Sequence, residues 1–215
     1  MMKLFLTSTG LTNKSLINKF IEMVGKQPKE MTVAYVPTAI NTSSSPDKRW
    51  SIDNLRRLDD MKVANIDIVD FSAIPKEMWL PRFERADAIY VEGGTPAYLK
   101  SEIEKAGLIE LFKTTLSDKV YVGCSAGSNV LGEIIIKSMK KEPWYKVEDG
   151  FKLFNFTIRP HYLRGDRTFF NDDVIQKLAK DLNTTIYAID DESGIAIDGD
   201  KLEVISEGKW KKFEK

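Results

Sequence analysis

Short, uninterrupted apolar runs recur along the chain up to residue 122, and they constrain the fold more than any other feature of this sequence. Such runs, without polar alternation, are typical of strands covered on both faces, as in a parallel sheet. Amphipathic segments separate the runs, and alternating strands and helices are typical of a doubly wound α/β fold. We predict strands at 3–8, 31–36, 66–69, 88–91 and 120–122, and helices at 13–24, 51–61, 79–85, 96–105 and 108–116.

The pattern changes after residue 131, where shorter strands dominate. We predict strands at 134–136, 156–158, 186–189, 194–197 and 202–205, and a helix at 174–182. Asp198-Gly199-Asp200 is typical of a hairpin turn. No internal repeat and no long linker interrupts the sequence. We therefore expect residues 1–215 to form a single α/β domain, with a mostly parallel central sheet, helices on both faces and short strands near the C-terminus.

The charge balance and the rare residues limit what the chain can bind. Its 215 residues carry 32 Lys and Arg against 32 Asp and Glu, so no net charge attracts phosphate backbones or anionic lipid. One cysteine cannot form an internal disulfide, which suits a reducing compartment, and no apolar run approaches the length of a membrane span. We expect a cytoplasmic protein without nucleic-acid or membrane partners. With one cysteine and one histidine, the zinc-site spacings are absent, so we expect no metal.

The chemistry of the chain concentrates in Gly123-Cys124-Ser125-Ala126-Gly127, directly after the predicted strand 120–122. A strand, the pattern Gly-x-Ser-x-Gly and a helix form a nucleophile elbow, which projects the central side chain from the sheet on a strained turn. The amide of Ala126, at the start of the helix, would then stabilise an oxyanion formed on attack by Ser125. A glycine-rich turn with a capping serine is the alternative. In an elbow, Cys124 is expected to be a small buried residue.

Two further segments also follow predicted strands. Glu92-Gly93-Gly94-Thr95-Pro96 comes after the strand 88–91, at the edge where open α/β sheets bind ligands, although a plain strand-to-helix turn explains it as well. His161 follows the strand 156–158 and Pro160. A lone histidine is usually structural or exposed. Its place past a strand end, downstream of an elbow serine, makes it a candidate general base.

These three segments resemble the peptidase E (α-aspartyl dipeptidase) group of serine peptidases, relatives of cyanophycinase in the class I glutamine amidotransferase-like superfamily. The stretches that carry the resemblance are Gly-Cys-Ser-Ala-Gly-Ser-Asn-Val at 123–130, Val-Glu-Gly-Gly-Thr-Pro-Ala-Tyr-Leu at 91–99 and Ile-Arg-Pro-His-Tyr at 158–162. The resemblance extends over essentially the whole chain and implies a class I glutamine amidotransferase-like fold. It implies that Ser125 is the nucleophile, that His161 is the base and then the acid, and that the amides of Gly94 and Ala126 form the oxyanion hole. The family hydrolyses short peptides with an acidic N-terminal residue, without metal or cofactor.

The sequence departs from the family pattern at two places. Glu92 stands where the family has a glycine, so we expect a carboxylate near the site. The family's third triad member is an aspartate before Met-Pro, where this chain reads Met139-Lys140-Lys141-Glu142-Pro143. Glu142 is the nearest carboxylate of that loop, and a glutamate can orient an imidazole as an aspartate does. A solvated loop glutamate is the alternative role for Glu142, and Glu133 is the reserve candidate.

An acidic substrate needs a cation to meet its carboxylate. Arg164 and Arg167 lie close to His161 in the sequence, and a guanidinium can bind a carboxylate with two parallel hydrogen bonds. Surface arginines are usually only solvated, which is the alternative for both. Arg159 is expected instead to point into the fold and pair with an acid.

The resemblance therefore predicts a serine peptidase, most simply a dipeptidase preferring an N-terminal Asp, with a small peptide as its substrate and no cofactor. Two other functions stay open. One is an esterase or amidase that acts on a small non-peptide substrate with the same Ser125–His161 dyad. The other is a catalytically silent family member that binds a ligand or a partner, which the absent aspartate and the altered glycine run favour. The sequence indicates no oligomeric state, and a homodimer is compatible with it.

Overall fold

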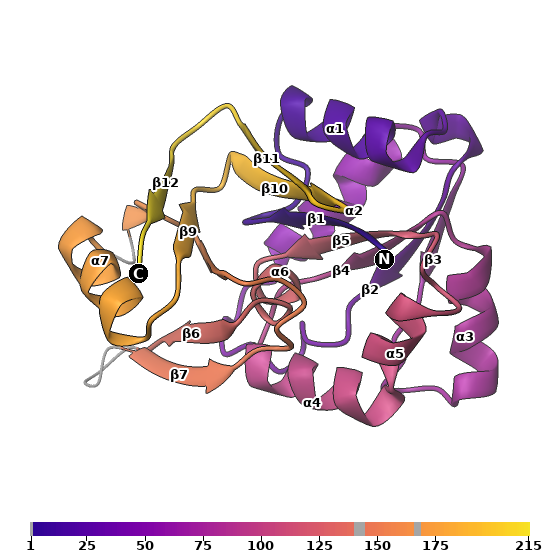
Figure 1. The fold of residues 1–215 in the computed structure, drawn as a ribbon. Coiled ribbons are helices and arrows are strands. Elements are labelled where there is room, and N and C mark those ends of the chain that lie inside the picture. The colour runs from indigo at the N-terminus through magenta and orange to yellow at the C-terminus, as the bar shows by residue number, and fades with distance from the viewer. Residues whose placement is uncertain (1, 140–144, 166–168) are drawn as a thin grey trace.

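The structure is a computed structural model that describes residues 2–139, 145–165 and 169–215. It confirms the predicted fold class: a mostly parallel central sheet lies between helices, and short strands follow toward the C-terminus (Figure 1). In chain order the elements are β1 (Lys3–Thr7), α1 (Lys14–Val24), a 3₁₀ turn (Pro28–Glu30), β2 (Thr32–Val36), α2 (Arg49–Asp60), β3 (Asn65–Ile68), α3 (Lys76–Arg85), β4 (Ala88–Val91), α4 (Pro96–Ala106), α5 (Leu108–Lys113), β5 (Val120–Cys124), α6 (Ala126–Asn129), β6 (Ile134–Ser138), β7 (Tyr145–Asp149), β8 (Thr157–Pro160), α7 (Asp172–Asp181), β9 (Ile186–Ile189), β10 (Ser193–Asp198), β11 (Lys201–Ser206) and β12 (Trp210–Phe213).

The central sheet brings the ends of three strands together. Within the described part of the chain, its strands lie in the order β11-β10-β1-β5-β4-β2-β3. The strands from β1 to β3 in this order run parallel, and β10 and β11 complete the sheet in antiparallel pairs. Gly123 of β5 lies opposite Leu6 of β1 on one side and Val91 of β4 on the other. The loops that follow β1, β4 and β5 therefore begin side by side at one edge of the sheet.

Helices cover both faces of this sheet, which explains the continuous apolar runs of the central strands. Every residue of β4 and β5 is buried. Side chains of α1 and α2, among them Phe20 and Leu58, pack on one face. Side chains of α3, α4 and α5, among them Phe83, Leu99 and Phe112, pack on the other face. No helix in the described ranges combines the length and apolar character that a membrane span requires.

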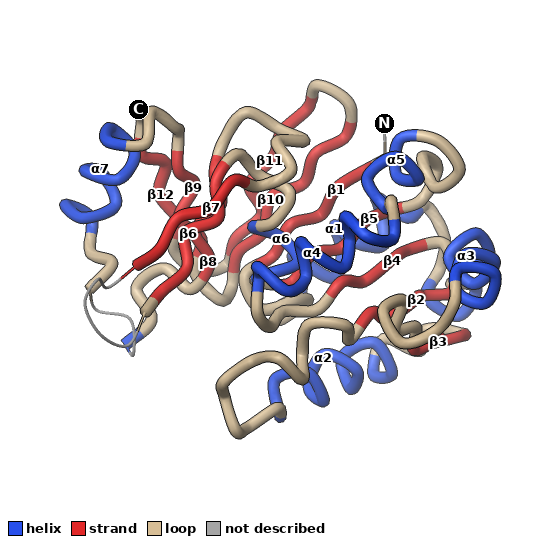
Figure 2. The backbone as a smooth tube through the Cα atoms, turned by 90° about the horizontal axis from the view of Figure 1, so that it is seen from below, coloured by secondary structure: helices blue, strands red, loops and turns tan. Residues whose placement is uncertain are grey.

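A smaller sheet, in the order β12-β9-β8, and the β6-β7 hairpin extend the fold beside β10 and α6 (Figure 2). Strands β8 and β9 are parallel, with Pro160 opposite Ile189. The residues that follow these two strands therefore come close in space, although they are far apart in the sequence. Strands β7 and β12 were not predicted from the sequence, since both are short, charged and mostly exposed.

Candidate active site

Ser125 lies at the sharp turn between β5 and α6, where the elbow motif predicts it. Its backbone has φ 49° and ψ −101°, a conformation that residues other than glycine rarely adopt. The glycines of the motif allow the close approach that this turn requires. A Cβ on Gly123 would lie 2.8 Å from the backbone of Gly127, and a Cβ on Gly127 would lie 2.2 Å from the Val91 carbonyl oxygen. Any larger residue at either position would collide with the main chain.

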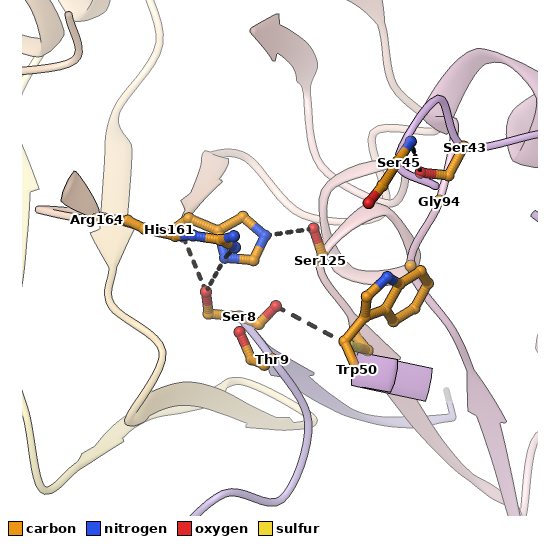
Figure 3. A pocket seen from close by; sticks show the side chains of 11 residues that line it. Ser8, Thr9, Ser43, Ser45, Trp50, Gly94, Ser125, His161 and Arg164 are labelled. Atoms are coloured by element: carbon orange, nitrogen blue, oxygen red, sulfur yellow. Dashed lines mark hydrogen bonds between the residues drawn. The ribbon is translucent and has the colours of Figure 1, made fainter. Parts of the chain in front are cut away.

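His161 reaches Ser125 from the end of β8. The distance between Ser125 Oγ and His161 Nε2 is 2.9 Å (Figure 3). The imidazole is buried, and its residue has a left-handed backbone with φ 62°. The main-chain N–H of His161 donates a hydrogen bond to Ser8 Oγ at 2.8 Å. This bond ties the end of β8 to the end of β1 and so places the ring opposite the elbow.

Asp191 binds the other side of the imidazole. Its Oδ1 lies 2.6 Å from His161 Nδ1, and it also accepts hydrogen bonds from the hydroxyls of Ser8 at 2.8 Å and Thr9 at 2.6 Å. Burial alone would raise the pKa of Asp191, but the hydrogen bonds from His161, Thr9 and Ser8 outweigh it and hold that pKa well below its usual range. The ionised carboxylate favours a proton on Nδ1, which leaves Nε2 as the acceptor that faces Ser125.

Asp191, Ser8 and Thr9 were not predicted from the sequence. A signal for them exists, because Asp190-Asp191 follows the predicted strand 186–189, and Ser8-Thr9 lies at the end of the first one. Strand ends are where open α/β sheets place their sites. The sequence does not show, however, that β8 and β9 are neighbours, or that the loop after β1 lies across from them.

Among Glu133, Glu142 and Arg167, the structure describes only Glu133. Glu142 and Arg167 lie outside the described residues. Asp191 occupies the position at His161 Nδ1 that was predicted for Glu142. The reserve candidate, Glu133, accepts a hydrogen bond from Thr184 Oγ1 at 2.6 Å, away from the imidazole.

The turn between β4 and α4 places Gly93 and Gly94 against the elbow. A Cβ on Gly93 would lie 3.3 Å from Ser125 Cβ. Gly94 has φ 142°, and a Cβ on it would lie 1.9 Å from the Ala39 carbonyl oxygen, so this position accepts only glycine. Ala126 is the first residue of α6, and its amide has no acceptor inside the helix. Among the described residues, neither the Gly94 nor the Ala126 amide donates a hydrogen bond, so both are available as donors beside Ser125.

A pocket of about 190 Å³ opens in front of Ser125 and His161 (Figure 3). Trp50 and Arg164 form part of its wall. The structure places Arg164 at the site, with one guanidinium nitrogen 3.5 Å from His161 Nδ1. Nδ1 donates its proton toward Asp191, so it cannot accept a hydrogen bond from Arg164. Arg164 therefore places a positive charge near the ring but does not orient it.

A second hollow, of about 320 Å³, adjoins the other side of Ser125 and Gly94. Lys137 and Arg159 line it. Arg159 is 2% exposed, so it lies inside the fold as predicted, and its guanidinium stacks on the Phe170 ring at 3.9 Å from the centroid. Cationic residues therefore line the hollows on both sides of Ser125.

Two residues beside the site in the sequence, Cys124 next to the nucleophile and Glu92 next to the glycine turn, both lie inside the fold. Cys124 is 2% exposed, as predicted, and burial raises the pKa of its thiol, so the thiol stays protonated and unreactive. Glu92 is fully buried and lines neither hollow. In the described ranges, no three His, Cys, Asp or Glu side chains come together in a way that could hold a metal ion.

Known proteins share this sequence pattern and this fold. The sequence profile of peptidase family S51 matches residues 4–205, a range that contains Ser125, His161 and Asp191. The chain belongs to peptidase family S51. As an S51 member it is a serine-type peptidase, and hence a hydrolase. It is 25% identical to an uncharacterized peptidase of Pasteurella multocida, over 93% of this chain and 95% of the relative. It is also 25% identical to an uncharacterized peptidase of Listeria monocytogenes, over 94% of this chain and 97% of the relative.

Two solved structures have the same fold as this S51 chain. One is the crystal structure of a candidate peptidase E protein from Listeria monocytogenes, with a TM-score of 0.73 and 24% identity, covering 97% of this chain and 100% of that one. The other is a peptidase from an acI-B1 Actinobacterium, with a TM-score of 0.72 and 17% identity, covering 100% of this chain and 91% of that one. These likenesses confirm the predicted peptidase E-like architecture, and the family assignment rests on the sequence profile.

Proposed function

We propose that this S51 peptidase is a dipeptidase that cleaves short peptides with an acidic N-terminal residue, through an acyl-enzyme on Ser125. The observation that carries the proposal is the line of three side chains, with Ser125 Oγ 2.9 Å from His161 Nε2 and His161 Nδ1 2.6 Å from Asp191. In serine hydrolases such a line supplies the nucleophile, the base and the group that orients the base.

In the acylation step, Ser125 Oγ bonds to the scissile carbonyl carbon while His161 Nε2 takes the hydroxyl proton. The carbonyl π electrons move to the oxygen, which becomes an oxyanion. The amides of Gly94 and Ala126 donate hydrogen bonds to this oxygen, where charge develops in the transition state. Asp191 stabilises the imidazolium that forms at the same time.

The tetrahedral intermediate collapses when the carbonyl re-forms and the C–N bond breaks. His161 Nε2 gives its proton to the leaving amine, which departs as the second amino acid. A water molecule then attacks the acyl ester and gives a proton to Nε2. The proton returns to Ser125 Oγ as the acid product leaves, so each cycle consumes one water and regenerates the enzyme.

The charge around Ser125 supports a preference for acidic peptides. Arg164 lines the pocket in front of His161, and Lys137 lines the hollow on the other side of Ser125. A guanidinium recognises a carboxylate more strongly than an amide of the same shape, because the hydrogen bonds are charge-assisted. Arg167 is proposed for the same role. The size of the pocket, about 190 Å³, suits a short peptide.

A panel of dipeptides tests the substrate preference. We expect kcat/KM for Asp-Leu to exceed that for Asn-Leu by at least about tenfold, since loss of one charge-assisted pairing costs about 1.5–3 kcal/mol. Arg164→Gln should raise KM for Asp-Leu and leave Ala-Leu unchanged. Equal rates for Asp-Leu, Asn-Leu and Ala-Leu would contradict the preference. Cleavage of simple esters without cleavage of any peptide would favour the esterase instead.

Replacing Cys124 tests whether the neighbouring thiol takes part. Cys124→Ala is expected to keep kcat/KM within about threefold of the wild type, because the thiol is buried and protonated and a small residue still fits. The measurement is steady-state hydrolysis of the best dipeptide. If Cys124→Ala lost hydrolysis and Ser125→Ala kept it, the cysteine would be the nucleophile.

The pH dependence tests the base. Nε2 must be unprotonated to accept the Ser125 proton, so kcat/KM should rise with pH as His161 titrates and fall about tenfold per pH unit below that range. The lowered pKa of Asp191 keeps its carboxylate ionised throughout, so one group alone should shape the acid limb. We expect log kcat/KM, measured from about pH 4 to pH 8, to approach a slope of one on its acid limb. A slope of two would contradict this assignment.

A further inference from the structure

Glu92 is a buried acid directly before the glycine turn, and no step of the mechanism uses it. Its side chain is 0% exposed. Oε2 accepts a hydrogen bond from the main-chain N–H of Gly93 at 2.9 Å. Oε1 accepts one from the Tyr35 hydroxyl and one from Asn54 Nδ2, each at 2.7 Å. Burial raises the pKa of the Glu92 carboxyl, and these donors act against that shift by stabilising the charged form.

The surroundings of Glu92 require an acceptor at both oxygens. Asn54 Oδ1 accepts a hydrogen bond from Arg57 at 2.6 Å, which turns the NH₂ group of Asn54 toward Glu92. The N–H of Gly93 can only donate. A glutamine at position 92 has one oxygen and one NH₂ group, so whichever way it turns, its NH₂ group meets Gly93 N–H or Asn54 Nδ2. The carboxylate is therefore matched to its donors in a way that the isosteric amide is not.

The bond from Gly93 determines which amide of the turn serves the site. Because Gly93 N–H points to the Glu92 carboxylate, it is withdrawn from a carbonyl bound at Ser125. The Gly94 amide remains as the donor of this turn. The turn also packs against the nucleophile, since a Cβ on Gly93 would lie 3.3 Å from Ser125 Cβ. A shift of the turn would therefore change the distance between the Gly94 amide and the oxyanion.

The same network reaches the elbow strand. Asn54 Nδ2, which donates to Glu92, also lies 3.6 Å from Cys124 Sγ, the residue before Ser125. Tyr35, the other donor, contacts the Ser51 hydroxyl at 2.6 Å. Glu92 thus links Tyr35 of β2 and Asn54 of α2 to the glycine turn, and Asn54 extends the network to the strand that carries the elbow.

We propose that Glu92 is a positioning residue, which holds the Gly93–Gly94 turn so that the Gly94 amide meets the oxyanion. It acts through Gly94 and does not touch the substrate. The inference rests on the proposed function, because it assigns Glu92 a part in stabilising the transition state of that reaction.

Glu92→Gln tests this role. We expect kcat to fall by about 10²-fold with KM within about twofold, since a misplacement of about 1 Å costs that much in the transition state. Hydrogen exchange measured by mass spectrometry should be faster in the peptide that contains Gly93 and Gly94. Tyr35→Phe removes a single donor and should show a smaller loss of kcat in the same direction, which keeps the test available if Glu92→Gln folds poorly.

Asp87→Asn is the matched control, because Asp87 stands just before the other end of β4. Its carboxylate accepts the main-chain N–H of Thr32 at 2.8 Å, far from the turn. Asp87→Asn should lower Tm and leave kcat and the exchange of the turn unchanged.

Two results would overturn the proposal: a Glu92→Gln enzyme with the wild-type kcat, or a kcat loss that Asp87→Asn reproduces at an equal loss of Tm. Failure of the proposed function gives a different result, namely wild-type hydrolysis that Ser125→Ala does not reduce. If only the Glu92 proposal is wrong, hydrolysis will still be lost in Ser125→Ala, so the two failures can be told apart.

Discussion

A Ser125→Ala variant is expected to fold as the wild type does and to lose hydrolysis by about 10⁶-fold. The substitution removes only Oγ, whose partner is His161 Nε2 at 2.9 Å. The backbone of the elbow is held by other groups, since the Ser125 N–H donates to the Thr7 carbonyl at 3.1 Å and the glycines set the close approach. Without Oγ no acyl-enzyme forms, and only the weak catalysis due to binding and to the oxyanion hole remains.

Ser128→Ala is the matched control for this experiment. Ser128 stands in the same short helix, and its hydroxyl donates to the Thr7 carbonyl at 2.7 Å, so it supports the fold without reaching His161. A fluorophosphonate probe followed by intact-mass measurement should add one adduct to the wild type and to Ser128→Ala, and none to Ser125→Ala. Wild-type rates in Ser125→Ala, or an adduct that moves to Cys124, would contradict the assignment of the nucleophile.

The fold could be predicted because its signals are local. The strands at 88–91 and 120–122 are buried on both faces, so their apolar runs are visible in the sequence. The helix predicted at 108–116 ends earlier, at Lys113, and β12 (Trp210–Phe213) gave no apolar run because three of its four residues are exposed. The half-exposed periphery carries a weaker pattern than the core, and there the prediction was least complete.

The residues of the site also differ in how well the sequence predicts them, according to whether they act within one local turn or are brought together by the fold. Gly123, Ser125 and Gly127 act within one turn, so their spacing alone indicated an elbow, and the structure shows the strained backbone and the close contacts that the elbow needs. The partner of His161 depends on which strand lies next to β8. That neighbour is β9, which follows in the sequence after a helix, and the aspartate beyond it has no motif of its own. The resemblance directed attention to the loop of Glu142 instead.

Replacing Asp191 tests whether Asp191 or Glu142 is the carboxylate that orients His161. Within the described residues, its hydrogen-bond donors His161, Ser8 and Thr9 all meet the single atom Oδ1. An asparagine that keeps its oxygen there orients the imidazole but leaves the imidazolium without a counter-charge. An asparagine turned the other way places its NH₂ group against Nδ1 and favours the wrong tautomer. In either case we expect Asp191→Asn to lower kcat by about 10²–10⁴-fold.

The controls for Asp191→Asn are the neighbouring acid and the loop acid. Asp190 accepts the Ser193 hydroxyl at 2.6 Å and supports the turn between β9 and β10, so Asp190→Asn should lower Tm and keep the rate. Glu142→Gln should keep both the wild-type Tm and the wild-type rate, since Asp191 already occupies the position at Nδ1. kcat is measured as a pH profile for each variant, and the plateau values, where the base is unprotonated, are compared. If Asp191→Asn keeps the wild-type rate while Glu142→Gln loses it, the carboxylate that orients His161 during the reaction is Glu142; if neither loses it, Ser125 and His161 act as a dyad.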